Sequence, residues 1–388
     1  MDTHIRGARV LTPDGVFVET GVAIADGRIV GIGDHTPTGR VIEAGGLLLL
    51  PGIVDLHGDA FERQLMPRPR VHFPTDVALL DTDRQLVANG ITTALHGLTW
   101  SWEPGLRGRD AAVRFLDTLE RLRPTLGCDS HVHLRHEVYN IDAADEIERW
   151  LAEGRIRLLA FNDHLPMFTS RIEQPAKLAQ YAERAHMTVP AFIALVHAVA
   201  ERAPQVDPTN RRLAAAARRH GVALASHDDG TPEVRRHFHD LGCAICEFPL
   251  NRATAEESRR LGSGVIGSGV ILGAPNVVRG GSHIDGGMRA ADMAAAGLVD
   301  VLTSDYYYPA LAHAAFALAR QGILPLAQAW ALVSTNPARL GGFADRGHIA
   351  AGQRADLVLV DDRVPELPRV VATLVAGRPV FASRDLAS

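Results

Sequence analysis

His57 and Asp59 have the residue types and the spacing of a metal-ligand pair. They end an apolar run at residues 50–56, which predicts a buried strand that delivers both side chains from its carboxyl end. Residues two apart on a strand point to the same side, so an imidazole and a carboxylate at this spacing can bind one ion. A surface His-x-Asp sequence also arises by chance, and the pair therefore needs support from the rest of the chain.

Apolar, strand-like runs alternate with Ala- and Arg-rich helical stretches through the middle of the chain, a pattern typical of parallel βα units. Eight strands are predicted, at residues 53–59, 92–98, 130–138, 157–162, 222–227, 244–248, 270–274 and 301–305. Helices are predicted between and after them, at residues 110–122, 143–153, 211–219, 233–241, 255–261, 287–296 and 309–321. The natural closure is a (β/α)₈ TIM-like barrel, an α/β fold whose active site lies where the strands end.

The residues at these strand ends are polar. They are His57, Asp59, Glu137, Asp163, His164, His227, Asp228, Asp229, Glu247, Asn276 and Asp305. Each has an ordinary alternative when taken alone, such as a loop position for His164 or a helix cap for Asp305. Together they predict a metal site, because buried carboxylates gathered in one barrel mouth repel each other without cations. Mixed imidazole and carboxylate ligands suit Zn²⁺, Mn²⁺ or Fe²⁺, and two ions bridged by a carboxylate are a common hydrolytic arrangement.

Other metal-like patterns in the chain are interpreted as structural. His131 and His133 have a familiar His-x-His spacing, but they precede Glu137 on the same strand, toward the barrel interior or its bottom. The three cysteines, Cys128, Cys243 and Cys246, do not make a disulfide framework for a chain of 388 residues. We interpret them as ordinary buried cysteines.

Both ends of the chain predict one small β domain. Short alternating runs between residues 3 and 49 are separated by turn sequences at 13–15, 25–27 and 44–46, which is typical of a small antiparallel sheet. The same pattern of short strand-like runs separated by turns recurs from residue 352 to residue 381. The sequence therefore predicts a small β-sandwich domain from residues 1–50 and 343–388, with the barrel at 51–342.

Charge and composition limit the partners. The hydrophobic content of 46% can build a sizeable core, and the formal net charge of -5, with a pI near 6.4, gives no general reason to bind nucleic acid or an anionic membrane. An anionic small-molecule substrate therefore needs a local basic pocket. No apolar run approaches the roughly 20 residues that cross a bilayer, and the first residues lack the apolar core of a signal peptide. A cytoplasmic location is the expectation.

Several longer motifs resemble a known family. The entry into the barrel at residues 51–57 and the closing segment at 347–358 resemble the amidohydrolase superfamily. Asp59 stands where a second histidine is usual. The segments 65–69, 134–137, 225–229, 273–283 and 304–307 resemble one branch, the α-D-ribose 1-methylphosphonate 5-triphosphate diphosphatase family of the carbon-phosphorus lyase pathway. The resemblance spans nearly the whole chain.

The resemblance implies a centre with two divalent ions, zinc first, with manganese or iron as alternatives. The implied ligands are His57, Asp59, Glu137, His164, His227 and Asp305, with Glu137 bridging. The family reaction splits a 5-triphosphate into the 5-phosphate and pyrophosphate by attack of a metal-bound hydroxide, since the ion lowers the pKa of its water to about 7. We predict that Asp305 orients this water and takes its proton.

A phosphate-binding site is predicted at Arg279, because a guanidinium donates two parallel hydrogen bonds to phosphate oxygens. The glycines that follow Arg279 also let backbone N–H groups approach the phosphate. Further candidate substrate contacts are Arg68, Arg135, His283, Asn276 and Trp100. Arg135 has a second interpretation, the neutralisation of buried carboxylates. Trp100 could stack on a substrate ring or simply pack within a loop.

Departures from the family pattern leave the reaction open. Trp100 and Trp102 end the second strand, the segment 163–168 is more apolar than the family pattern, Ala60 follows Asp59, and Asp285 adds a carboxylate. The alternative is an amidohydrolase that cleaves a carbon-nitrogen bond in a cyclic amide, an N-acyl group or an aminated ring. Arginines that converge on the mouth favour phosphate, whereas aromatic walls favour an amide or ring. A third hypothesis is an inactive metal-bearing scaffold, and superfamily precedent predicts a homo-oligomer.

Overall fold

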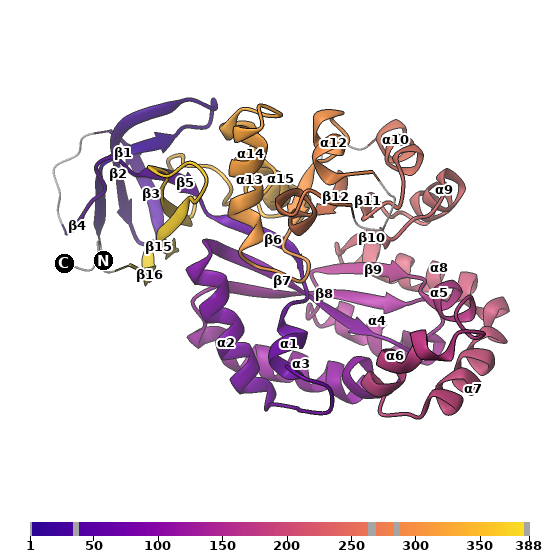
Figure 1. Ribbon diagram of the computed structural model, residues 1–388. Coiled ribbons are helices and arrows are strands. Elements are labelled where there is room, and N and C mark those ends of the chain that lie inside the picture. Colours follow the sequence, from indigo (N-terminus) through magenta and orange to yellow (C-terminus); the bar gives the residue numbers. More distant parts are fainter. Residues whose placement is uncertain (1, 34–38, 263–268, 283–287, 384–388) are drawn as a thin grey trace.

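Two sheets, one of them covered by helices, make up the part of the chain that the computed structural model describes, residues 2–33, 39–262, 269–282 and 288–383. The sheet formed by the two chain ends lies at one side of the molecule, and the larger helix-covered part lies beside it (Figure 1). Within the described residues, no helix has the length and apolar character needed to span a membrane.

The larger part is a parallel barrel. Its strands are β6 (Ile53–Gly58), β7 (Ile91–Trp100), β8 (Asp129–Glu137), β9 (Leu158–Asn162), β10 (Ala223–His227), β11 (Ile245–Glu247), β12 (Gly269–Gly273) and β13 (Val301–Thr303). Each strand pairs in parallel with the next, and an isolated bridge between Gly58 and Asp305 brings the last strand back to the first. The predicted eight-stranded TIM-like barrel is confirmed.

Helices follow the strands and lie outside them (Figure 1). They are α1 (Phe61–Leu65), α2 (Thr75–Ala88), α3 (Arg109–Leu122), α4 (Ala144–Ala152), α5 (Leu165–Thr169), α6 (Ala179–Arg184), α7 (Val189–Ala200), α8 (Ala203–Arg219), α9 (Pro232–Asp240), α10 (Arg252–Arg260), α11 (Ala274–Val278), α12 (Ala290–Ala295), α13 (Ala310–Arg320), α14 (Leu326–Ala331) and α15 (Thr335–Leu340). The sequence did not predict α1, α2, α11, α14 or α15, nor the inserted helices α5 to α7. These inserted helices follow β9, so they lie on the side of the barrel where strands end.

The smaller sheet joins the two chain ends. Its strands are β1 (Thr3–Leu11), β2 (Phe17–Ala25), β3 (Arg28–Ile32), β4 (Arg40–Glu43), β5 (Leu48–Pro51), β14 (Leu357–Asp361), β15 (Arg369–Val375) and β16 (Arg378–Ala382). Antiparallel pairing of β5 with β14 connects residues that are more than 300 positions apart. This confirms that both ends form one β unit, with β4 and β5 paired in parallel to β1. The predicted boundaries at residues 50 and 342 stay a prediction.

The barrel interior is polar at the carboxyl ends of the strands and apolar beneath them. Leu56, Leu95 and Ala160 belong to a buried cluster that also includes Leu340 and Phe343, which follow the last strand and come from α15 and its end. These apolar side chains fill the lower barrel, as expected for a fold with a packed interior. Chemistry is thereby restricted to the barrel mouth, the end where the carboxyl ends of the strands meet.

Candidate metal centre

The first ligand group forms where the barrel closes. The backbone N–H of Asp305 donates to the His57 carbonyl at 2.9 Å, and the Asp59 N–H donates to the Asp305 carbonyl at 2.9 Å. This pairing brings His57, Asp59 and Asp305 together, with one potential ligand atom from each within 4.8 Å of the others. Asp305 has a φ of 54°, a left-handed conformation that is uncommon outside glycine and that often marks functional sites.

A buried carboxylate supports this closure from below. Asp55, which is 0% exposed, accepts hydrogen bonds from Ser304 N at 3.0 Å and Ser304 Oγ at 2.5 Å, and from His57 N at 3.3 Å. Burial raises the pKa of the Asp55 carboxyl to about 6, although the bonds from Ser304 oppose the rise. Asp55 thus holds His57 and Ser304, the two residues that directly precede the bridged pair Gly58 and Asp305.

The second ligand group lies across the mouth. His164 follows β9, His227 ends β10, and both have Nε2 within 3.7 Å of an Asp228 carboxylate oxygen. One potential ligand atom from each of the three lies within 4.8 Å of the others. Asp228 has a φ of 59°, again in the left-handed region. The sequence placed Asp228 at a strand end but did not select it as a ligand.

Glu137 contacts the other nitrogen of His164. Glu137 is buried at the end of β8, and its Oε1 lies 2.5 Å from His164 Nδ1. Burial alone would lower the pKa of His164, but the Glu137 and Asp228 carboxylates outweigh it and raise the pKa to about 9. The two carboxylates on either side of His164 therefore favour its positively charged form. The structure places Glu137 against His164, and its bridging role stays a prediction.

Arg135 lies between the two ligand groups. It is 5% exposed, and its Nη1 donates to Asp59 Oδ2 at 3.1 Å while its Nη2 lies 3.0 Å from His227 Nε2. A guanidinium can only donate, so this nitrogen of His227 acts as an acceptor. The contact supports the interpretation that Arg135 neutralises buried carboxylates, and it leaves the guanidinium within the mouth where an anionic substrate would arrive.

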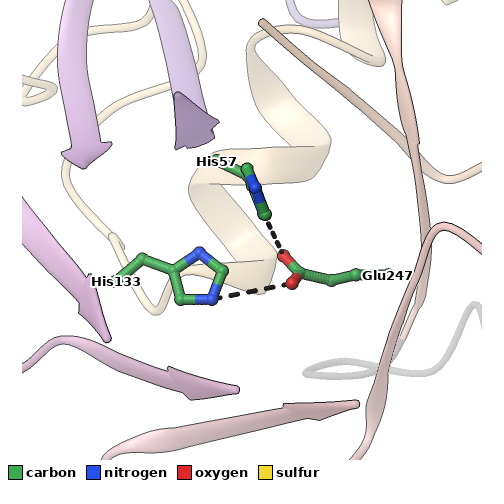
Figure 2. Close-up of side chains that lie close together, drawn as sticks. All are labelled: His57, His133 and Glu247. Carbon is green, nitrogen blue, oxygen red and sulfur yellow. Dashed lines mark hydrogen bonds and ion pairs between the residues drawn. The ribbon is translucent and has the colours of Figure 1, made fainter. Parts of the chain in front are cut away.

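Glu247 is a further carboxylate at the strand ends, and it faces His57 and His133 (Figure 2). It ends β11, is 0% exposed and lies 3.2 Å from His57 Nδ1 and 3.3 Å from His227 Nδ1. His133 Nε2 lies 3.6 Å away. His133 is fully buried inside the barrel, and its Nδ1 is 3.1 Å from the Leu56 carbonyl. The interior position predicted for His133 is therefore observed, but directly beneath the site.

The predicted phosphate-binding site lies beside Asp305. Arg279 caps α11, and its Nε donates to Asn276 Oδ1 at 3.2 Å. Asn276 in turn approaches Asp305 across Gly273, since a Cβ atom on that glycine would lie 3.2 Å from both Asn276 Nδ2 and Asp305 Oδ2. A side chain at Gly273 would crowd both groups. Arg279 and Asp305 therefore lie on the same side of the barrel, with Asn276 bonded to Arg279 and placed beside Gly273.

Three other predicted contacts have different outcomes. Arg68 is exposed in the loop after α1, where its carbonyl accepts from the Val71 N–H. Trp100 is 3% exposed and packs on Trp150 of α4, with ring centroids 4.8 Å apart, so it faces the helical layer and not the mouth. His283 lies outside the described residues. We retain Arg68 as a prediction and leave Trp100 out of the proposed site.

A buried ion-pair network, which could not be predicted from the sequence, lies between the loop after β7 and the inserted helix α6, outside the two ligand groups. Arg107 donates two hydrogen bonds of 2.9 Å to Glu62, three residues after Asp59, and Arg184 of α6 contacts Glu103. Burial, followed by the positive charge of Arg107, lowers the pKa of Arg184. Two guanidinium groups are therefore held close together on the side of the mouth from which α5 to α7 project.

The donor set fits divalent metal ions. The described residues form three potential ligand groups, the two above and a third of His57, His133 and Glu247, and each combines imidazole nitrogen and carboxylate oxygen, a mixture that suits zinc, manganese or iron. The surrounding carboxylates outnumber the cations that face them, and His164 is held in its charged form by this excess. A bound metal would supply that positive charge. The geometry and chemistry of the site are those of a metal-dependent hydrolase at the mouth of a parallel barrel.

Comparison with known proteins agrees with this class. Residues 84–381 match the model of a family described as "Amidohydrolase family", and the chain belongs to this family. It is 35% identical to the alpha-D-ribose 1-methylphosphonate 5-triphosphate diphosphatase of Escherichia coli (strain K12), over 80% of this chain and 82% of the relative. It is 27% identical to an adenine deaminase of Methylobacterium nodulans, over 99% of this chain and 60% of that protein.

Solved structures share the fold. N-isopropylammelide isopropylaminohydrolase from Burkholderia multivorans matches with a TM-score of 0.66 and 20% identity, covering 98% of each chain. Dihydropyrimidinase from Brevibacillus agri matches with a TM-score of 0.59 and 19% identity, covering 100% of this chain and 96% of the other. The chain is therefore a hydrolase of the amidohydrolase superfamily, and its substrate has to be argued from the site.

Proposed function

We propose that the protein is a metal-dependent diphosphatase that hydrolyses α-D-ribose 1-methylphosphonate 5-triphosphate to the 5-phosphate and pyrophosphate. The observation that carries this proposal is the placement of arginines at the ligand groups. Arg135 contacts Asp59 and His227, and Arg279 bonds to Asn276, which lies with Asp305 against Gly273. The similarity to the diphosphatase of Escherichia coli supports the same substrate.

The proposed centre assigns each group a task. His57, Asp59 and Asp305 would hold one divalent ion, and His164 and His227 would hold the other with Glu137 or Asp228. Zinc is our first choice, with manganese or iron as alternatives. Such ions would supply a nucleophile at neutral pH, because a divalent ion lowers the pKa of water to about 7. Asp305 would orient the attacking water and accept its proton.

Charge distinguishes a phosphorus anhydride from an amide as substrate. A triphosphate brings several negative charges to the mouth, and guanidinium groups bind phosphate oxygens through two parallel hydrogen bonds. In this proposal Arg135 and Arg279 would make this contact. Trp100 could have formed an aromatic wall for a ring, but it packs on Trp150 outside the mouth. These features favour phosphate over a carbon-nitrogen substrate.

The second candidate is hydrolysis of a carbon-nitrogen bond, and one observation favours it. Tyr306 and Tyr307 directly follow Asp305 and are 43% and 47% exposed, so aromatic faces are available beside the proposed catalytic carboxylate. A planar base or cyclic amide could stack there. Relatives such as the adenine deaminase give this candidate further support.

Parallel assays separate the two candidates. Protein loaded with Zn²⁺ or Mn²⁺ is incubated with α-D-ribose 1-methylphosphonate 5-triphosphate while pyrophosphate is measured, and with adenine and cyclic amides while ammonia release and ring opening are measured. We expect pyrophosphate release alone. Ring opening or ammonia release, with no pyrophosphate from protein that holds two metal equivalents, would replace the diphosphatase proposal with the carbon-nitrogen one.

A further inference from the structure

One carboxylate, Glu247, faces a histidine of each ligand group. Its Oε1 lies 3.2 Å from Nδ1 of His57, and its Oε2 lies 3.3 Å from Nδ1 of His227. His57 belongs to the group with Asp305 and also to a third potential ligand group with His133 and Glu247, whereas His227 belongs to the group with Asp228. Figure 2 shows Glu247 with the two oxygens directed at His57 and His133 from across the barrel. A single side chain therefore contacts both halves of the proposed centre.

The contact determines which nitrogen of each ring carries hydrogen. A carboxylate oxygen accepts and does not donate, so both Nδ1 atoms must be the N–H donors. The lone pair of each neutral imidazole is then on Nε2, the atom left for a metal. At His227 an independent contact gives the same tautomer, because Arg135 Nη2 donates to Nε2 at 3.0 Å. Arg135 uses the lone pair that an ion would take, so the guanidinium would have to release Nε2 when a metal binds.

Packing holds the three side chains in place. Glu247 pairs in register with His227 on the neighbouring strand and is 0% exposed. The rings of His57 and His227 stack with centroids 5.4 Å apart and planes 17° apart. Phe248 contacts both rings edge-on, at 5.0 Å and 5.1 Å. Phe248 itself has a φ of 51°, a strained conformation for an aromatic residue directly after Glu247. The arrangement leaves little freedom for either ring to turn.

We propose that Glu247 is a positioning residue that sets His57 and His227 in the tautomer and orientation required to bind both metal ions through Nε2. This inference rests on the metal centre of the proposed function and not on its substrate. Removing such an outer carboxylate typically weakens metal binding by 10 to 100-fold. Because Glu247 serves both ligand groups, both ions should be affected by one substitution.

The test compares Glu247→Gln with a control, Glu103→Gln. Glu103 is also buried, at 2% exposure, but it contacts Arg184 and not a histidine. Metal affinity is measured by competition with a chelator, in the absence of substrate. We expect Glu247→Gln to weaken both sites by about 10 to 100-fold and the control to retain wild-type affinity. Wild-type affinity in Glu247→Gln would overturn the proposal.

A measurement on the wild-type protein keeps the proposal testable if the variant does not fold. In protein loaded with Co²⁺, ligand histidines give shifted proton resonances, and we expect exchangeable Nδ1–H signals from both His57 and His227 that disappear in D₂O. Absence of these signals would refute the tautomer assignment. A metal-bound structure with a Glu247 oxygen within about 2.2 Å of an ion would also overturn the proposal, since Glu247 would then be a ligand.

These outcomes are separate from those of the proposed function. Weak metal binding by Glu247→Gln together with no pyrophosphate release by the wild-type protein would support the positioning role and reject the diphosphatase. Normal metal binding by Glu247→Gln together with rapid pyrophosphate release by the wild-type protein would do the reverse.

Discussion

Replacement of Asp305 by asparagine should remove catalysis while the fold and the metal ions remain. The two bonds that join Asp305 to the first strand use its backbone N–H and carbonyl, so the barrel closure does not depend on the carboxylate. Asparagine also tolerates the left-handed φ of 54° better than most residues. The substitution therefore changes the chemistry of the side chain with little backbone cost.

The magnitude follows from the role proposed for this carboxylate. An amide cannot take the proton of the attacking water, and a positioned general base contributes about 10²–10⁴-fold to the rate. We expect kcat to fall by this factor, which corresponds to about 3–5 kcal/mol in activation free energy. Loss of one anionic ligand should weaken the metal in the first group without emptying the second.

The assay measures kcat for pyrophosphate release at saturating Zn²⁺ or Mn²⁺, with metal content determined on the same sample. Asp228→Asn serves as a matched control, because Asp228 is also a carboxylate at a strand end with a left-handed φ, of 59°. It should change metal affinity at the second group more than it changes kcat at saturating metal. Unchanged kcat in Asp305→Asn with both ions bound would refute the assignment.

Three further substitutions test other parts of the account. Arg279→Ala should raise the KM for the triphosphate by on the order of 10², through loss of a charge-assisted bond, and an unchanged KM would remove Arg279 from the phosphate site. Trp100→Phe should leave kcat and KM unchanged but lower the urea midpoint of unfolding, because Trp100 packs on Trp150. Asp129→Asn should destabilise the protein by about 1–3 kcal/mol at pH 7, since Arg346 and Arg354 each lose a charged partner at 2.6 Å. Burial would raise the pKa of Asp129, but contacts with His131 and Arg346 outweigh it and lower the pKa. The ionised carboxylate therefore stabilises the folded protein fully above about pH 4, and this stabilisation is lost as the pH falls below that value. The difference in unfolding free energy between Asp129→Asn and the wild type should accordingly become smaller in acid.

The barrel could be predicted because strands buried on both faces read as continuous apolar runs. β6, β10 and β12 begin within one residue of their predicted positions. The helix α2 was missed because Val77 and Leu80 are exposed, which blurs the apolar stripe of an amphipathic helix.

The start of α8 was predicted too late for a different reason. Proline usually ends a helix, and the sequence has Pro204 and Pro208 before the predicted start at residue 211. The helix nevertheless begins at Ala203, with Pro204 in its first turn, where no backbone N–H bond is lost. Packing of Leu213, Ala214 and Ala217 against the barrel then supports the longer helix. Tertiary contacts outweighed the local signal.

The candidate site, like the fold, could be predicted only in part from the sequence. Strand ends placed His57, His227 and Asp305 near one another, since parallel strands end on one side of a barrel. Which groups pair across the mouth could not be predicted, because this depends on strand register and side-chain direction. Glu247 and Asp228 both stood at predicted strand ends, and position alone did not distinguish a support for two histidines from a ligand.

Metal titration of pyrophosphate release would show whether this protein is a two-metal diphosphatase. Protein stripped of metal is titrated with Zn²⁺, and in parallel with Mn²⁺, in the presence of α-D-ribose 1-methylphosphonate 5-triphosphate. We expect no release without metal and a rise in rate that saturates at two equivalents per chain. Release at full rate from metal-free protein, or no release at two bound equivalents, would refute the two-metal diphosphatase.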